Sequence, residues 1–268
     1  MGAPAVHEES FGELLRSWRQ RRRVSQLDLA IEAEVSARHV SFLETGRARP
    51  SREMVMKLAE ELDVPLRHRN RLLVAAGFAP AFREREVLAP EMGVVRQAIE
   101  KILHAHNPFP AVVVDAAWNL VSANDSASAF FAGVVKPELL EGDPVNVLRL
   151  TLHPDGMARS LANLAEVRAH LLHRVRRQAE ASGDGRLTEL HDELAGYRYP
   201  GVQLNVAHVP GPGDILLPIR VRDGERVLSM FTTIATFGSP LDVTVSELAI
   251  ETLWPADEET ARAFTAAG

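Results

Sequence analysis

The sequence predicts a two-domain protein, with an all-α bundle of five helices followed by an α+β domain built on an antiparallel sheet. The chain has 268 residues, more than the ~100–200 of an average domain. Apolar residues recur every three to four positions in the first 80 residues, whereas short apolar runs bounded by turn residues follow. The two parts also differ in net charge. Residues 1–85 contain 15 basic and 12 acidic residues, a net charge of +3, and the remainder contains 15 basic and 24 acidic residues, a net charge of −9.

The five helices of the first domain are predicted from apolar spacing and from residues that start or end helices. The first helix, over residues 11–23, has one apolar face made of Phe11, Leu14, Leu15 and Trp18. Hydroxyl side chains cap helix starts, so the next three helices are expected to begin at Ser25, Ser36 and Ser51. Pro65 marks the first turn of the fifth helix, and glycine ends the third and fifth helices at Gly46 and Gly77.

The domain boundaries follow from a change in composition. We place the helical domain at residues 9–79, because the apolar helical pattern stops there. A linker is expected at residues 80–91, which contain the charged stretch Arg83-Glu84-Arg85-Glu86 between two prolines. The second domain is expected at residues 92–265.

The second domain alternates between strand and helix patterns. Two paired strands, a short helix and a long helix are expected at 111–115, 118–122, 125–131 and 161–180. Three strands close the domain at 215–222, 226–236 and 242–254. Asp223-Gly224 lies between the first two of these and is a strong hairpin signal. The pattern predicts an antiparallel sheet with helices on one side.

Composition excludes several classes of function. The chain has no cysteine, which removes disulfides, thiolate metal sites and cysteine nucleophiles. No run of ~18 apolar residues occurs and the first residues lack a signal-peptide layout, so no membrane partner and a cytoplasmic location are expected. The glycine-rich and serine motifs of nucleotide-binding and hydrolytic enzymes are also missing, and we expect a protein that is not an enzyme.

The first domain carries a basic cluster next to two closely spaced short helices. Eight arginines are bunched there, at Arg16, Arg19, Arg21, Arg22, Arg23, Arg47, Arg49 and Arg52. A surface of that sign attracts polyanions. A sharp turn between two short helices leaves the second one free to enter the ~12 Å wide major groove of DNA.

Residues 14–62 resemble the Cro-type (XRE) helix-turn-helix family. The matching motifs are Ser25-Gln26, Leu29-Ala30, Val35-Ser36, Val40, Leu43-Glu44, Gly46 and Pro50-Ser51. The resemblance implies sequence-specific binding to double-stranded DNA through a recognition helix that begins at Ser36. Two copies on a palindromic operator would multiply affinity, so we also expect a homodimer.

The resemblance assigns roles in DNA contact to individual residues. Gln26, at a helix N-terminus, matches the family position that holds a phosphate. Ala37, Arg38 and Phe42 match outward positions of the recognition helix; Arg38 suits guanine and Phe42 suits a thymine methyl group.

Two further arginines and one ion pair complete this family pattern. Arg47 and Arg49 follow the recognition helix and would lie along the DNA backbone. A solvated basic surface is the simpler alternative for these arginines. Arg19 and Glu44 match positions that pair as an ion bridge. Glu34 departs from the family, which has glycine in this turn, because the backbone there tends to take a positive φ.

The second domain resembles a PAS-type sensor and, more narrowly, the MmyB-like ligand-binding domain found behind XRE helix-turn-helices. The segments that carry this likeness are 118–124, 146–156, 161–171 and 237–248. The resemblance implies a small-molecule cavity, no cofactor, and an apolar or fatty-acid-like ligand. Candidate lining residues are Trp118, Asn124, Arg149, His153, Leu216 and Met230. The alternative is an ordinary packed core in which Trp118 fills space and Asn124 caps the following helix.

Two other interpretations of the second domain remain open. One is an enzyme, for which Glu166, His170 and His173 lie at helical spacing on one face of the long helix. A solvated charged face explains these three side chains equally well, because four arginines share the helix, and we predict no metal site. The other is a dimerisation domain without a ligand cavity.

Overall fold

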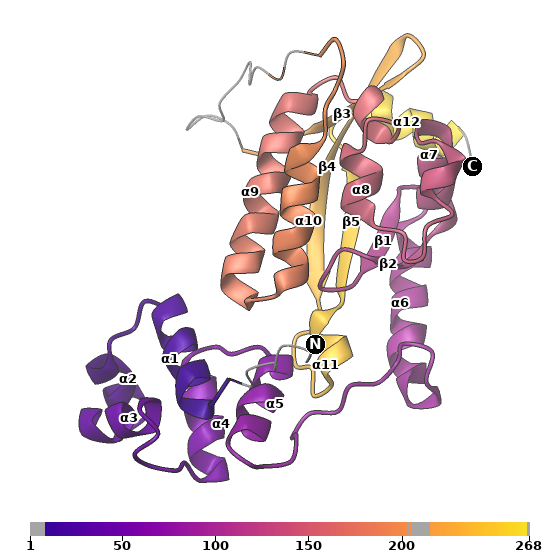
Figure 1. Ribbon diagram of the computed structural model, residues 1–268. Coiled ribbons are helices and arrows are strands. Elements are labelled where there is room, and N and C mark those ends of the chain that lie inside the picture. Colours follow the sequence, from indigo (N-terminus) through magenta and orange to yellow (C-terminus); the bar gives the residue numbers. More distant parts are fainter. Residues whose placement is uncertain (1–8, 203, 205–214, 267–268) are drawn as a thin grey trace, which may run out of the picture. The chain divides into compact units, whose positions relative to one another are not determined.

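The computed structural model describes residues 9–202, 204 and 215–266. The chain divides into two compact units, one made chiefly of residues before Glu86 and the other chiefly of those that follow. Figure 1 shows a purely helical first unit and a second unit in which helices surround a sheet. Both predicted fold classes are therefore confirmed.

All five predicted helices of the first unit are present. They are α1 (Phe11–Arg21), α2 (Gln26–Glu32), α3 (Ala37–Glu44), α4 (Arg52–Glu61) and α5 (Leu66–Ala75). Serine hydroxyls cap the first four helices by accepting backbone N–H bonds, at Ser10, Ser25, Ser36 and Ser51. Pro65 is the N-cap residue of α5, one position before the helix that it was expected to begin. The apolar face predicted for the first helix, which includes Leu15 and Trp18, lies in the core, where it packs with Leu29, Val40 and Leu58 of the next three helices.

The second unit contains all the strand-forming segments. Its elements are η1 (Pro90–Met92), α6 (Gly93–His106), β1 (Ala111–Val114), β2 (Leu120–Ala123), α7 (Asp125–Val134), η2 (Pro137–Leu139), α8 (Val147–Leu152), η3 (Met157–Arg159), α9 (Leu164–Ser182), α10 (Gly185–Gly196), β3 (Ile219–Asp223), β4 (Arg226–Thr236), α11 (Val243–Glu247), β5 (Ala249–Pro255) and α12 (Glu258–Ala266). The strands form one antiparallel sheet in the order β2-β1-β5-β4-β3. Asp223 pairs with Arg226 across the predicted hairpin.

Helices cover both faces of the sheet, so the predicted one-sided arrangement is wrong. Val112 and Val114 of β1 pack into the main core with α7, α8, α9 and α10. Their neighbours Ala111 and Val113 pack against α6 on the other face. Because side chains alternate along a strand, the uninterrupted apolar run of β1 is the signature of a strand buried on both sides.

Two of the closing strands differ from their predicted limits. The third strand begins at Ile219 rather than residue 215, since Pro218 has no N–H to donate and Ile219 pairs with Met230. The last predicted strand divides into α11 and β5. Thr236, the final residue of β4, pairs with Ala249, and the residues before Ala249 have no strand partner in β4.

Two further predictions are corrected in the same unit. The long helix begins at Leu164 instead of Leu161, because the backbone on both sides of Leu161 bonds to β3. The N–H of Ala162 donates to the Arg220 carbonyl at 2.8 Å, and the N–H of Arg222 donates to the Ser160 carbonyl at 2.8 Å. Trp118 lies in the β1–β2 turn with φ +68° and not in a strand. Its N–H donates to the Asp115 carbonyl, which closes that turn.

Candidate functional sites

The turn between α2 and α3 leaves one side of α3 open to solvent. Ser36 Oγ accepts from the His39 N–H at 3.1 Å and fixes the start of α3. Val40 and Leu43 face the core, whereas Ser36 and Arg38 are exposed and Ala37 and Phe42 are half-buried. The side chains expected to meet DNA therefore share the accessible side of α3.

Phe42 lies between two arginines. The Arg38 guanidinium carbon is 5.1 Å from the Phe42 ring centroid, and the Arg47 guanidinium carbon is 5.9 Å from it. Both distances are within the range of cation–π attraction. The Phe42 ring therefore places Arg38, which is expected to contact a base, near Arg47, which is expected to contact the DNA backbone. Arg49 is exposed farther along the same loop. Sequence reasoning overlooked this stacking, which the four-residue spacing of Arg38 and Phe42 signals.

The predicted ion pair of Arg19 and Glu44 is present, and Gln26 joins it. Arg19 Nε donates to Glu44 Oε1 at 2.6 Å, and Gln26 Nε2 donates to Glu44 Oε2 at 2.7 Å. Burial alone would raise the pKa of Glu44, but the hydrogen bonds from Arg19 and Gln26 outweigh it and the pKa is lowered. The hydrogen bond to Glu44 also raises the pKa of Arg19. Gln26, expected to hold a phosphate, has its amide on Glu44 in this structure.

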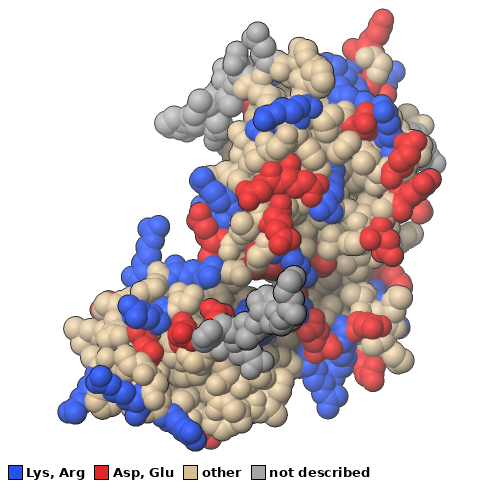
Figure 2. Space-filling view, viewed as in Figure 1, with Lys and Arg blue, Asp and Glu red and all other residues tan. Residues whose placement is uncertain are grey.

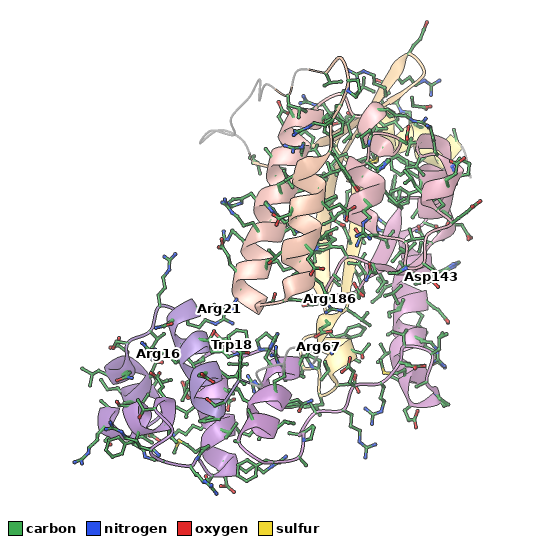
Figure 3. The ribbon with its side chains drawn as sticks, in the orientation of Figure 1. Arg16, Trp18, Arg21, Arg67, Asp143 and Arg186 are labelled. Atoms are coloured by element: carbon green, nitrogen blue, oxygen red, sulfur yellow. The ribbon has the colours of Figure 1, made fainter. Side chains whose placement is uncertain are left out.

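The arginine cluster at the end of α1 serves structure as well as charge. The Arg21 and Arg22 guanidinium carbons lie 5.2 and 5.4 Å from the centroid of Trp18, which is buried. Arg22 also donates to the carbonyls of Leu62 and Asp63, at the end of α4. Figure 3 shows Arg16 and Trp18 on α1, and in Figure 2 basic side chains project at several points from the helical unit.

The six residues proposed to contact a ligand lie in different places. Trp118 and Met230 are buried in the main core, and Asn124 is buried as the N-cap of α7, where it accepts from the Ala127 N–H at 2.9 Å. Leu216 lies before β3 and is 56% exposed. None of the six lines either of the two cavities of the second unit that are described below.

Arg149 and His153 share one surface cluster. Arg149 makes a two-pronged ion pair with Glu193, whose carboxylate also accepts from the Tyr197 hydroxyl at 2.6 Å. The His153 ring meets the Tyr197 ring edge-on, with centroids 5.2 Å apart. The hydrogen bond to Glu193 raises the pKa of Arg149. Both side chains therefore already have protein partners.

A polar cluster that sequence reasoning missed lies beneath α9. The Arg174 guanidinium carbon is 4.3 Å from the Trp118 ring centroid, and Arg174 also pairs with Glu251 of β5 at 3.5 Å. Trp118 Nε1 donates to Gln178 Oε1 at 2.8 Å. Burial raises the pKa of Glu251, and the charge of Arg174 offsets this only in part.

Two cavities of the second unit carry opposite charge. The arginine-lined cavity, about 460 Å³, lies beside the start of α9; its walls include Leu161, Leu164, Tyr199, Glu166, Arg159, Arg220 and Arg222. The aromatic cavity, about 430 Å³, lies between α7, the β3–β4 hairpin and α12; its walls include Phe130, Phe264, Val221, Leu228, Asp125 and Asp223. Because side chains alternate between the two faces of a strand, Arg220 and Arg222 of β3 line the arginine-lined cavity, whereas Val221 lines the aromatic cavity.

Comparison with known families assigns both units. A family model described as the MmyB-like transcription regulator ligand binding domain matches residues 95–267, and a helix-turn-helix domain model matches residues 10–72. The chain belongs to the MmyB-like transcription regulators. The first unit matches a helix-turn-helix domain, and the second unit matches the ligand-binding domain of these regulators. Both domains are of the regulator type.

Broader comparisons of the regulator add little. One solved structure, described as an RNA-binding light-oxygen-voltage receptor, is similar with 14% sequence identity and a TM-score of 0.31. The match covers 98% of this chain and 63% of that one, so this chain spans less than two thirds of its length. No curated protein matches.

Potential metal ligands in the described part of the regulator do not converge. In those ranges, no group of three or more His, Cys, Asp or Glu side chains is arranged to hold a metal ion. Glu166 instead accepts from Asn163 at 3.2 Å, and burial and the charge of Arg174 lower the pKa of His170. Within the same ranges, every helix is too short or too polar to span a bilayer.

Proposed function

We propose that this protein is a sequence-specific, dimeric transcription regulator whose operator affinity is changed by an apolar or fatty-acid-like ligand. The observation that carries the DNA part is the exposed side of α3, which presents Arg38 stacked on Phe42. We propose no catalytic step. We also propose the predicted domain limits, 9–79 and 92–265 with a linker at 80–91.

The proposed DNA contacts divide into base reading and backbone binding. Arg38 binds a guanine edge with two hydrogen bonds, and the Phe42 ring beside it contacts a thymine methyl group. Ala37 and Ser36 approach the same groove edge from the start of α3. Arg47 and Arg49 neutralise phosphates, and Gln26 exchanges its bond to Glu44 for a phosphate oxygen.

The arginine-lined cavity suits a ligand with a carboxylate head and an acyl chain. Three arginines face a single glutamate on its walls, and Leu161 and Leu164 offer apolar surface. Arg222 donates to the Leu161 carbonyl at 3.0 Å, which holds its guanidinium at the cavity wall. Arginine is well suited to a carboxylate, and burial of each methylene of the chain contributes about 0.8 kcal/mol.

Ligand binding acts on DNA through the dimer. Two helix-turn-helix units on one palindrome gain affinity from their high effective concentration. A ligand that favours one arrangement of the pair changes the separation of the two α3 helices, and its effect is limited by its difference in affinity between the two arrangements.

The DNA proposal is tested by selecting operators from a random duplex library and measuring affinity at fixed salt. Arg38→Ala should weaken discrimination at one base pair by about 1–3 kcal/mol. Arg47→Ala should weaken all sequences and lower the slope of log affinity against log salt by about 0.9. Arg186→Ala, in α10, is the control and should change neither quantity. Equal effects of Arg38→Ala on every sequence would refute base reading by α3.

The ligand proposal needs a separate measurement. Small molecules released from the purified protein are identified by mass spectrometry, and operator affinity is measured with and without decanoate. Decanoate should bind, and should shift operator affinity; Arg220→Ala should weaken its binding at least tenfold. Binding that leaves operator affinity unchanged at fixed salt would rule out the regulatory step.

A further inference from the structure

The aromatic cavity is a second hollow, open to solvent on one side, and its lining differs in chemistry from that of the arginine-lined cavity. It measures about 430 Å³, which is within the range of small-molecule sites in proteins. Phe130 of α7 and Phe264 of α12 line it, with ring centroids 6.1 Å apart. Val221 and Leu228 supply an aliphatic wall from the β3–β4 hairpin. The cavity therefore offers apolar surface from three separate elements.

Charge in this cavity has one sign. Asp125, at the start of α7, and Asp223, at the end of β3, are acidic residues that both line it, and both are exposed. None of the described lining residues is Lys or Arg. Arg226 is the cross-strand partner of Asp223, yet it is not among the lining residues and no ion pair between the two is present in the described part of the chain. Arg262 of α12 pairs with Glu258 instead.

The combination of aromatic rings and carboxylates has a clear chemical preference. A cation is attracted to the face of an aromatic ring and also to a carboxylate, whereas a carboxylate ligand is repelled by both. A hydrocarbon group attached to the cation would be buried against Val221 and Leu228.

We propose that the aromatic cavity is a binding site for a small organic cation, an amine that carries an apolar chain or ring. The ammonium group lies at the mouth, between Asp125 and Asp223, and its N–H groups donate to their carboxylates. The apolar part packs against the Phe130 and Phe264 rings and the aliphatic wall of Val221 and Leu228. This site is separate from the arginine-lined cavity, which takes the opposite charge, and it does not depend on the function proposed above.

Three probes of equal chain length test the charge preference. Octylamine, octanol and octanoate are titrated into the full-length protein without DNA, and binding is measured by calorimetry below the concentrations at which these probes aggregate. Octylamine should bind at least tenfold more tightly than octanol. Asp125→Asn/Asp223→Asn should reduce octylamine affinity to the level of octanol. Glu138→Gln, which removes an exposed carboxylate outside the cavity, is the matched control and should leave octylamine affinity unchanged.

A cavity-filling variant tests the location. Ala129 lines the cavity from α7, so Ala129→Phe should abolish octylamine binding and leave any octanoate binding intact. The proposal would be overturned if octylamine still bound to Ala129→Phe, or if the protein preferred octanol to octylamine. It would also be overturned if the double Asn variant bound octylamine as tightly as the wild type. If Ala129→Phe does not fold, the double Asn variant still decides. A lack of octanoate binding, or of any effect on operator affinity, would count against the regulatory function and not against this site.

Discussion

The carboxylate of Glu44 accepts three hydrogen bonds, two from Arg19 and one from Gln26, while only 2% of its side chain is exposed. The negative charge of Glu44 is therefore buried away from water, and its carboxylate oxygens are paired with Arg19 and Gln26. Removing one partner from such a pair leaves an isolated buried charge, which is far more destabilising than loss of a surface ion pair.

Arg19→Ala should therefore lower the free energy of unfolding of the helical unit by about 3–5 kcal/mol. The measurement is chemical denaturation followed by circular dichroism. Arg71→Ala removes an arginine that pairs with Glu9 at 3.5 Å on the surface, and it should lower the free energy by less than about 1 kcal/mol. Equal losses in the two variants would contradict the importance of burial at Glu44.

Glu44 and Glu251 should give stability slopes of opposite sign with pH. The pKa of Glu44 is lowered by folding, so its contribution is present above the ordinary carboxyl pKa and is lost as the pH falls. The pKa of Glu251 is raised by burial, so the folded state binds its proton more tightly than the unfolded state. Its contribution is present at low pH and is lost as the pH rises through the raised pKa.

Glu251→Gln removes the second of these slopes. Relative to the wild type, the variant should gain stability progressively as the pH rises above the ordinary carboxyl range. Native-state hydrogen exchange of β5 amides, corrected for the intrinsic rate at each pH, measures this in the second unit alone. Glu44→Gln, followed at α3 amides, should show the reverse trend. A pH-independent difference for Glu251→Gln would contradict the effect of burial on this carboxyl.

The approach of α1 to α3 depends on a glycine. A Cβ atom on Gly12 would lie 2.6 Å from the Glu44 carbonyl oxygen and 2.7 Å from that of Leu43. Gly12→Ala should therefore push α3 away from α1, lower stability and weaken operator binding together. Denaturation and DNA titration measure the two effects. Gly93→Ala is the control, because a Cβ atom there would meet nothing within 4 Å; unchanged operator binding in Gly12→Ala would show that α3 tolerates the shift.

The α2–α3 turn contains a strained residue, Glu34, at a position where glycine would be unstrained. Glu34 has φ +53°, a region in which residues other than glycine cost about 1 kcal/mol. Its carboxylate pairs with Lys57 on the surface, an interaction that contributes little. Glu34→Gly should raise the free energy of unfolding by up to about 1 kcal/mol, as measured by chemical denaturation. A free energy of unfolding that falls in Glu34→Gly would contradict this account.

Elements with local signals were predictable from sequence, and elements fixed by distant partners were not. Serine caps and apolar spacing specify α1 to α4, and Asp223-Gly224 specifies the β3–β4 hairpin. By contrast, α11 forms because β4 ends opposite Ala249, which no pattern within residues 242–247 records. The start of α9 is likewise set by backbone hydrogen bonds that join Ser160 and Ala162 to β3.

Site prediction followed the same division. Arg19 and Glu44 were predicted to pair because their family positions match, and they do pair in the structure. The walls of the two cavities were missed because they combine short segments that are far apart in sequence, such as Phe130 with Phe264. Arg149, expected to be available to a ligand, has Glu193 as a partner that is 44 residues away.

At the scale of the whole molecule, charge separates the two tasks. The net charge of residues 1–85 is +3 and that of the remainder is −9, so the proposed DNA contacts fall on the part of the chain whose net charge favours a polyanion. A dimer then needs two half-sites on the same side of the duplex. Operators with half-sites one helical turn apart, or a multiple of ~10–10.5 base pairs, should bind best.

Inserting five base pairs between the half-sites should reduce affinity strongly, and inserting ten should restore most of it. Fluorescence anisotropy with full-length protein measures the affinities, and light scattering counts the chains per duplex. Two chains per operator are expected. Affinity that is insensitive to half-site spacing, with one chain bound, would contradict the dimer.

The three tryptophans occupy three distinct environments. Trp18 is 4% exposed in the helical bundle, Trp118 is 4% exposed beneath Arg174, and Trp254 is 40% exposed on the sheet beside His106. Indole emission depends on surrounding polarity and on nearby charge. Replacing two of the three by phenylalanine therefore leaves a single tryptophan. Its emission, excited at a wavelength that the two tyrosines do not absorb, reports on the helical bundle, the domain interior or the sheet surface without any attached label.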